Sequence, residues 1–374
     1  MKRTKAMNGL SRRASYLLGI AFFCLCVSFC SISHAAYDGR CLRQQSFLNR
    51  EQHRIYAIRS NGLNLTYMVD FPPPSFTGKR PVVYLMHGQG GYSTEEHIEA
   101  YKQAFLESLG CVVVRIDCTN NGRGDDQRGC NKSEGSLADF SIEGMLRNLR
   151  DVVADTQKTI AERADFSQVI MAGHSYGGMC ARTATEYAYA NTGDDILRKL
   201  GVIALVDLSG VISVPGTTKG LIARALGAAK DNMIGGETTV NRAYGKWSRE
   251  GQSFGMTFKG SDGQRFYSQG WEGYNAVNHL RNIPPKVAVV FQIGNPAKEP
   301  VIWCAGLPEA DAVRKFIAAV RERKSGAVFE SYDTPHQYTQ DVLPQMTADM
   351  IAALRPLFAP AVTVPARSPA AAFI

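Results

Sequence analysis

One short motif in this sequence sets a serine between glycines, Gly173-His174-Ser175-Tyr176-Gly177. It directly follows the apolar run 168–171 and precedes a helical pattern that begins at about Ser175. Between a buried strand and a helix, this spacing predicts a sharp turn that exposes the serine hydroxyl as a nucleophile. Glycine has no Cβ, so it lets the backbone turn tightly beside the serine. We therefore interpret Ser175 as a catalytic nucleophile.

A second glycine-rich motif, residues 87–91, reads His-Gly-Gln-Gly-Gly and follows the apolar run 81–86. It lacks the Lys-Ser/Thr ending of a phosphate-binding loop. A backbone N–H of this loop, together with one at the start of the helix after the serine, would stabilise an oxyanion. We predict that these two donors are the amides of Gln89 and Tyr176.

A serine hydroxyl is a poor nucleophile until a base removes its proton, and histidine is the usual base. His336 follows the last apolar strand, in Tyr332-Asp333-Thr334-Pro335-His336, and is our candidate. The other histidines downstream of residue 35 fit this role less well by position: His53, His87, His97, His174 and His279.

The third catalytic group should be a carboxylate that orients the imidazole and stabilises its charged form. Three acids follow strands at suitable places. Glu299 comes after the apolar run 287–291 and is the first choice, Asp207 ends an earlier run and is the second, and Asp333, close in sequence to His336, is the third.

The elements that must hold these residues alternate between strands and helices. Residues 52–59 and 63–70 predict a hairpin that turns at Asn61-Gly62. A continuous apolar run is typical of a buried parallel strand, and residues 81–86 form one. Further strands of mostly apolar sequence are predicted at 111–116, 168–171, 202–206, 287–291 and 327–329. Helical patterns between them include residues 93–110, with Ser93 and Glu96 as a capping box, and the later segments 308–320 and 341–354.

This alternation predicts an α/β fold, with a mostly parallel sheet covered by helices on both faces. The connection from about 209 to 282 is long and rich in aromatic residues, which indicates an inserted lid or cap. We expect one domain over 36–358 that contains this lid, and a disordered Ala- and Pro-rich tail over 359–374.

Together these motifs resemble the α/β-hydrolase superfamily, in its esterase and dienelactone-hydrolase-like branches. The resemblance rests on His87-Gly88 after a strand, on the glycine-flanked Ser175, and on the late His336. It spans most of residues 52–358 by element order. It implies the chain order nucleophile, acid, histidine, which Ser175, Glu299 and His336 satisfy, although the family acid at this place is more often Asp than Glu.

The beginning of the chain has the pattern of an export signal. Residues 1–35 hold five Lys or Arg and no acid, so the net charge of +8 falls to +3 without them. An apolar run over 16–29 precedes small residues at Ser33 and Ala35, which predicts cleavage after Ala35. We therefore expect export to the periplasm or secretion, with no stable membrane insertion after cleavage. The sequence does not decide between the Sec and twin-arginine export pathways. The charge that remains indicates no nucleic-acid partner.

Six cysteines follow residue 35, and an even number in an exported protein permits disulfides. Cys118 and Cys130 flank a Gly- and Asn-rich loop and are the predicted local pair. Cys111 and Cys180 lie in apolar contexts that also suit buried thiols. The sequence contains no C-x-x-C or H-E-x-x-H metal motif and no nucleotide-binding fingerprint, so we expect neither a metal nor another cofactor.

These features predict an exported serine hydrolase that cleaves a small carboxylic ester through an acyl-enzyme. A small serine peptidase, a thioesterase or an acyltransferase of the same fold remain alternatives. A non-catalytic ligand-binding protein that retains the fold is an alternative of another class. The sequence leaves the oligomeric state open.

Overall fold

A computed structural model describes most of the segment that the sequence predicts to be the folded domain. The described residues are 52–88, 91–119, 133–135, 142–190, 195–214, 252–253, 256–257, 274–296, 298–299, 310–334, 336 and 338–358.

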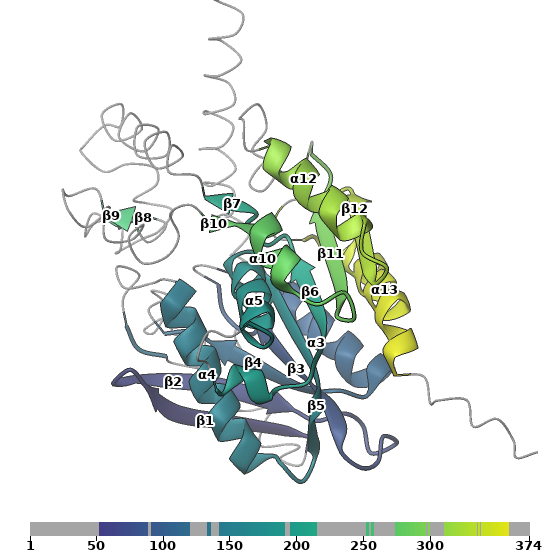
Figure 1. The fold of residues 1–374 in the computed structure, drawn as a ribbon. Coiled ribbons are helices and arrows are strands. Elements are labelled where there is room, and N and C mark those ends of the chain that lie inside the picture. The colour runs from purple at the N-terminus through teal and green to yellow at the C-terminus, as the bar shows by residue number, and fades with distance from the viewer. Residues whose placement is uncertain are drawn as a thin grey trace, which may run out of the picture.

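At the centre lies an eight-stranded sheet with the order β1-β2-β4-β3-β5-β6-β11-β12 (Figure 1). β1 pairs antiparallel with β2, β2 pairs antiparallel with β4, and the remaining neighbours are parallel. The strands are β1 (His53–Ser60), β2 (Leu63–Asp70), β3 (Arg80–Met86), β4 (Val112–Asp117), β5 (Ala164–His174), β6 (Val202–Leu208), β11 (Ala288–Gly294) and β12 (Gly326–Tyr332).

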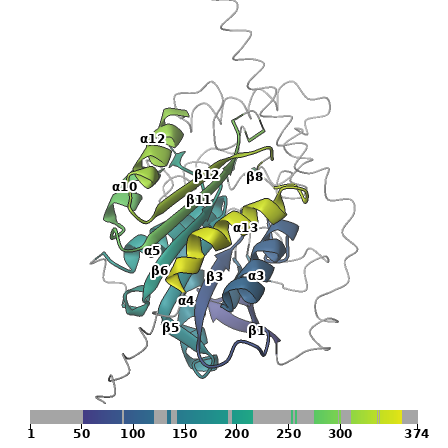
Figure 2. The same cartoon turned by 90° about the vertical axis from the view of Figure 1, so that its right-hand side faces the viewer.

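Helices cover both faces of the sheet, as Figures 1 and 2 show, so the predicted α/β architecture is confirmed. One face packs against α4 (Ile142–Thr159), α5 (Tyr176–Tyr187), α10 (Ala276–Asn282) and α12 (Ala310–Arg321). The other packs against α3 (Glu96–Leu109) and α13 (Leu343–Leu354). Two short 3-10 turns are η3 (Leu197–Lys199) and η4 (Arg355–Leu357). The central strands are buried on both faces, which explains their mostly apolar sequences.

The predicted hairpin is confirmed. β1 and β2 pair in register from His53 opposite Asp70 to Ser60 opposite Leu63. Asn61 and Gly62 between them both have positive φ, 50° and 79°. This backbone twist matches the twist of the strands, and Asn-Gly adopts it readily.

The start of α3 differs from the prediction. The helix begins at Glu96, its N-cap is Glu95, and no side chain caps it. The backbone N–H of Ser93 instead donates to Asp117 at 2.8 Å. The capping-box prediction was therefore wrong, because a tertiary contact with the end of β4 fixes this loop. The C-terminus agrees with the prediction, since Gly110 ends the helix with a φ of 63°.

The two described ends of the long connection lie together. β7 (Ser213–Val214) pairs antiparallel with β10 (Tyr274–Asn275). Between them, only β8 (Gln252–Ser253) and β9 (Met256–Thr257), which pair with each other, are described. The predicted lid falls mostly outside the described residues, as do the signal segment and the tail, and all three stay predictions. No helix among the described residues is both long enough and apolar enough to cross a bilayer.

The cysteines that the structure describes carry free thiols. Cys111, Cys118 and Cys180 are all buried and unpaired. A disulfide between Cys118 and Cys130 was therefore a wrong prediction for Cys118; Cys130 itself lies outside the described residues. Cys118 follows the last residue of the buried strand β4 and belongs to the main core, so its thiol packs as an apolar side chain.

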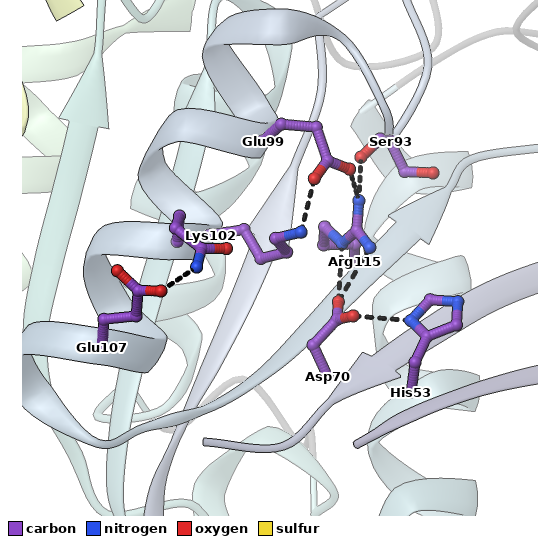
Figure 3. Close-up of polar contacts among 8 residues, drawn as sticks. His53, Asp70, Ser93, Glu99, Lys102, Glu107 and Arg115 are labelled. Carbon is purple, nitrogen blue, oxygen red and sulfur yellow. Dashed lines mark hydrogen bonds and ion pairs between the residues drawn. The ribbon is translucent and has the colours of Figure 1, made fainter. Parts of the chain in front are cut away.

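A buried charge network ties the edge strands to α3 (Figure 3). The Arg115 guanidinium donates to Asp70 through Nε at 2.9 Å and also binds Glu99 and the carbonyl oxygen of Ser93. His53 Nδ1 lies 2.6 Å from the other Asp70 oxygen. Because a buried charge without a partner is costly, these contacts fix β2, β4 and α3 relative to one another.

This network predicts a specific loss of stability in acid. Burial by itself would raise the pKa of Asp70, but the Arg115 charge and the His53 hydrogen bond outweigh it and lower the pKa to about 2. A carboxyl group whose pKa is lower in the folded than in the unfolded state stabilises the fold at pH values above its unfolded-state pKa, which is about 4. We expect about 2 kcal/mol of unfolding free energy to be lost between pH 4 and pH 2 through Asp70 alone.

Urea denaturation across this pH range measures the effect. An Asp70→Asn variant should be less stable near neutral pH and should lack this part of the acid dependence. The exposed Asp311→Asn variant on α12 should follow the parent curve. Equal pH slopes for the parent and Asp70→Asn would contradict the prediction.

Candidate active site

The predicted nucleophile lies on a sharp turn between β5 and α5. β5 ends at His174, α5 begins at Tyr176, and Ser175 between them has a φ of 55° and a ψ of −119°. A positive φ is unfavourable for a residue with a Cβ and is found mostly where a site needs it. The Ser175 N–H donates to the carbonyl oxygen of Leu208 at 2.9 Å, which holds the turn against the end of β6.

The two outer glycines of the motif are required by close backbone approach. A Cβ at Gly173 would lie 2.8 Å from the amide nitrogen of Gly178. A Cβ at Gly177 would lie 2.6 Å from the carbonyl oxygen of His87, at the end of β3. Rigid backbone atoms cannot move aside cheaply, so these positions exclude any larger side chain.

We therefore expect Gly177→Ala to lower the free energy of unfolding by about 2 kcal/mol, within the range for forced overpacking. Gly91→Ala is a matched control, since the nearest atoms to its Cβ would belong to the end of the Glu95 side chain and not to rigid backbone. Chemical denaturation of both variants measures the difference. A Gly177→Ala protein as stable as Gly91→Ala would contradict the close approach of the first turn of α5 to the end of β3 and His87.

The loop after β3 lies against the nucleophile. A Cβ at Gly88 would be 3.0 Å from the Ser175 Cβ and 3.5 Å from its Oγ. His87 holds this loop, because its Nε2 accepts the N–H of Cys118 at 3.2 Å while its Nδ1 donates to the carbonyl oxygen of Gly88 at 2.7 Å. Gln89, the predicted oxyanion donor, lies outside the described residues.

Tyr176, the other predicted oxyanion donor, is the first residue of α5. Its backbone N–H therefore lies at the positive end of the helix dipole, next to Ser175. This location is suited to a developing negative charge.

The predicted base and the first-choice acid meet in the structure. His336 Nδ1 lies 2.8 Å from Glu299 Oε1. Glu299 follows β11 and is fully buried, and its second oxygen accepts the backbone N–H of Gly294 at 2.5 Å. His336 follows β12, the neighbour of β11 in the sheet. The parallel register thus brings two residues that are 37 positions apart into one hydrogen bond.

Burial sets the ionisation of this pair. It raises the pKa of Glu299, while the hydrogen bonds from Ser209 and the Gly294 amide act in the opposite direction and favour the ionised carboxylate. It lowers the pKa of His336 to about 4. The imidazole is therefore neutral near pH 7, and neutral imidazole is the form that accepts a proton from a hydroxyl group.

The two alternative acids have other partners. Asp207 is fully buried and binds the guanidinium of Arg182, with Nε at 3.0 Å, and accepts the N–H of Gly210 at 2.9 Å. Asp333 is largely exposed and lies 3.6 Å from the ammonium group of Lys298. The structure therefore brings neither of them to His336 in place of Glu299.

Several contacts at this site had no interpretation at the sequence level. Ser209 has a φ of 49°, and its hydroxyl group contacts both Glu299 and the Tyr338 hydroxyl, the latter at 2.8 Å. His174 binds the main chain of His336 through its side chain. No motif marks Ser209 or Tyr338, and only the position of His174 inside the serine motif drew attention to it.

The described residues contain no group of three or more His, Cys, Asp or Glu able to hold a metal ion.

Comparison with known proteins identifies the family. A family model described as the alpha/beta hydrolase family matches residues 82–364, which is more than half of the chain. The protein therefore belongs to the alpha/beta hydrolase family. No curated protein matches the chain by sequence.

Solved structures of several esterases share this fold. Est1E from Butyrivibrio proteoclasticus, solved with ferulic acid bound, is 19% identical with a TM-score of 0.52, and the match covers 82% of this chain and 100% of that one. An esterase of Pyrococcus furiosus is 14% identical with a TM-score of 0.51, covering 83% and 93%. An esterase of the archaeon Pyrobaculum calidifontis is 14% identical with a TM-score of 0.50, covering 82% and 86%.

Proposed function

We propose that this protein is a serine hydrolase that cleaves small carboxylic esters through an acyl-enzyme intermediate. The observation that carries the proposal is the hydrogen bond between the buried Glu299 and His336, together with the strained turn at Ser175. His174, the residue before Ser175, binds the carbonyl oxygen of His336, and this contact brings the base to the nucleophile's side of the fold.

In the proposed reaction, the neutral His336 ring takes the Ser175 proton as the serine oxygen attacks the ester carbonyl. Glu299 accepts the Nδ1–H of His336, which fixes the ring tautomer and stabilises the imidazolium that forms. The tetrahedral oxyanion is held by the N–H of Tyr176 and by a donor of the loop after β3, for which Gln89 is proposed.

Collapse of the tetrahedral intermediate breaks the ester bond, and His336 returns the proton to the leaving alcohol. Water then attacks the acyl-serine with His336 again acting as base, which releases the acid and restores the serine. Apart from the ester and water, every proposed step uses side chains and amides of the protein. The esterase names of the structural neighbours favour an ester over the amide, thioester or acyl-transfer alternatives.

Hydrolysis of p-nitrophenyl esters of short and medium chain length tests the proposal. The parent protein should release p-nitrophenol, and the chain-length profile should reveal the size of the acyl pocket. No turnover of any ester by a folded parent protein would contradict the proposal and would favour a ligand-binding role.

Export is the second part of the proposal, and residues 1–35 support it through their basic start, apolar run and small residues before Ala36. Protein expressed from the full-length reading frame and recovered from the periplasm or medium should begin at Ala36. An intact Met1 terminus on cytoplasmic protein would contradict export.

A further inference from the structure

The His174 side chain links the nucleophile's turn to the loop that carries the base. Its Nε2 lies 2.7 Å from the backbone carbonyl oxygen of His336, across 162 positions of sequence. The His174 ring is almost fully buried, and it lies 4.7 Å from the His336 ring, centroid to centroid. The residue that precedes Ser175 in the chain therefore holds the main chain of His336.

This contact defines the protonation of His174. A carbonyl oxygen only accepts hydrogen bonds, so the proton of the neutral ring must be on Nε2. Nδ1 has no hydrogen-bond partner among the described residues, and nothing there requires a proton on it. Burial, together with the nearby rings of His336 and His87, lowers the pKa of His174 well below its ordinary value and keeps the ring neutral.

Aromatic neighbours hold the ring in this orientation. The His97 ring packs against it at 4.3 Å between centroids and 62° between planes, and the Tyr338 ring at 5.3 Å and 69°. Both contacts have the edge-to-face geometry that favours packing of aromatic rings. This packing restricts the rotamers of the His174 side chain, so its Nε2–H is already directed toward the His336 carbonyl group.

Glu299 alone does not fix the base relative to the nucleophile. It binds the Nδ1 atom of His336 from the loop after β11, whereas Ser175 follows β5, and β6 lies between these two strands. The main chain at His336 needs a separate anchor on the side of the serine, and His174 supplies it. An error of about 1 Å between reacting groups lowers a rate by about 100-fold.

We infer that His174 is a positioning residue, which sets the placement of His336 relative to Ser175 through its hydrogen bond to the His336 carbonyl group. This inference rests on the proposed ester hydrolysis. It implies that the histidine of the serine motif serves the rate of the reaction and not the binding of substrate.

Two substitutions of similar shape separate the hydrogen bond from packing. In His174→Gln the side-chain amide retains a donor near the position of Nε2, whereas His174→Met has similar length and no donor. With p-nitrophenyl acetate, we expect His174→Met to lower kcat by about 100-fold with KM changed by less than about 3-fold. His174→Gln should remain within about 10-fold of the parent kcat.

A His97→Phe variant is the control for packing, since it keeps a ring against His174 and makes no contact with the His336 carbonyl. It should keep kcat within about 3-fold of the parent. Thermal unfolding identifies folded variants, and His174→Asn, whose amide is too short to reach the carbonyl, replaces His174→Met if that protein does not fold.

The outcomes separate the inference from the function on which it rests. A parent protein that hydrolyses the ester, with His174→Met or His174→Asn equally fast, would overturn the inference and leave the proposed function intact. Equal losses in His174→Met, His174→Gln and His97→Phe would also overturn it, because packing would then account for the effect. A folded parent protein that hydrolyses no ester would overturn the proposed function itself.

Discussion

Replacing Ser175 with alanine is expected to lower kcat for ester hydrolysis by about a million-fold, the scale seen when a serine hydrolase loses its nucleophile. Ser175 lies on the strained turn between β5 and α5, next to the helix N-terminus and against Gly88. Without its Oγ no acyl-enzyme forms. Water must then attack the ester directly, and only the oxyanion donors remain to stabilise that transition state. Steady-state assays with p-nitrophenyl acetate measure the loss.

Ser93→Ala is a suitable control, because this serine is also buried and alanine keeps the backbone hydrogen bonds of residue 93 to Asp117 and Arg115. It should retain the parent kcat within about 3-fold. Activity that survives in Ser175→Ala at the parent level would show that another group is the nucleophile.

The second large effect is expected at Glu299. Glu299→Gln should lower kcat by about 10,000-fold, as happens when the acid of a serine triad becomes an amide. The side-chain NH2 group of glutamine would donate to His336 Nδ1, which forces the ring proton onto Nε2, so the ring then has no lone pair to accept the Ser175 proton. Loss of the carboxylate also leaves the imidazolium without its counter-charge.

Asp333→Asn is the matched control for this substitution. Asp333 lies three residues from His336 in sequence but is largely exposed, beside Lys298. It should keep kcat within about 3-fold of the parent. A large loss in Asp333→Asn together with a small one in Glu299→Gln would contradict the pairing of Glu299 with His336.

The sheet and the serine turn were predictable from the sequence because their signals are local. A strand buried on both faces is mostly apolar, and this property marks β3, β4, β6 and β11, although each also holds one or two polar or charged residues. The Asn61-Gly62 turn and the glycines around Ser175 reflect backbone angles or close approaches that few other residues tolerate.

The choice between the acids could not be made from the sequence, because it depends on contacts between distant segments. Asp207 and Glu299 both follow strands of the same sheet. Only the folded structure shows that Arg182 of α5 binds Asp207. It also shows that the loop after β12 places His336 within hydrogen-bond distance of Glu299. The capping box at Ser93 failed for the same reason, since Asp117 of a different strand binds that backbone.

The role of His174 was also hidden in the sequence. Its position in the serine motif is visible, but its partner is a backbone carbonyl group 162 positions away. Every residue has such a group, so the sequence cannot show which one is the partner. Likewise, Ser209 and Tyr338 meet near Glu299 only through the register of the sheet. Local sequence patterns predict secondary structure and motifs. The contacts that surround and support the catalytic side chains can be identified only in the folded structure.

Covalent labelling tests the central claim most directly. The folded protein is treated with a fluorophosphonate, which reacts with an activated serine, and the adduct is located by mass spectrometry of its peptides. We predict one adduct per chain, on Ser175, with labelling strongly slowed in His336→Ala. An unlabelled protein, or an adduct on another residue at full rate, would contradict the assignment of Ser175 as the nucleophile of this alpha/beta hydrolase.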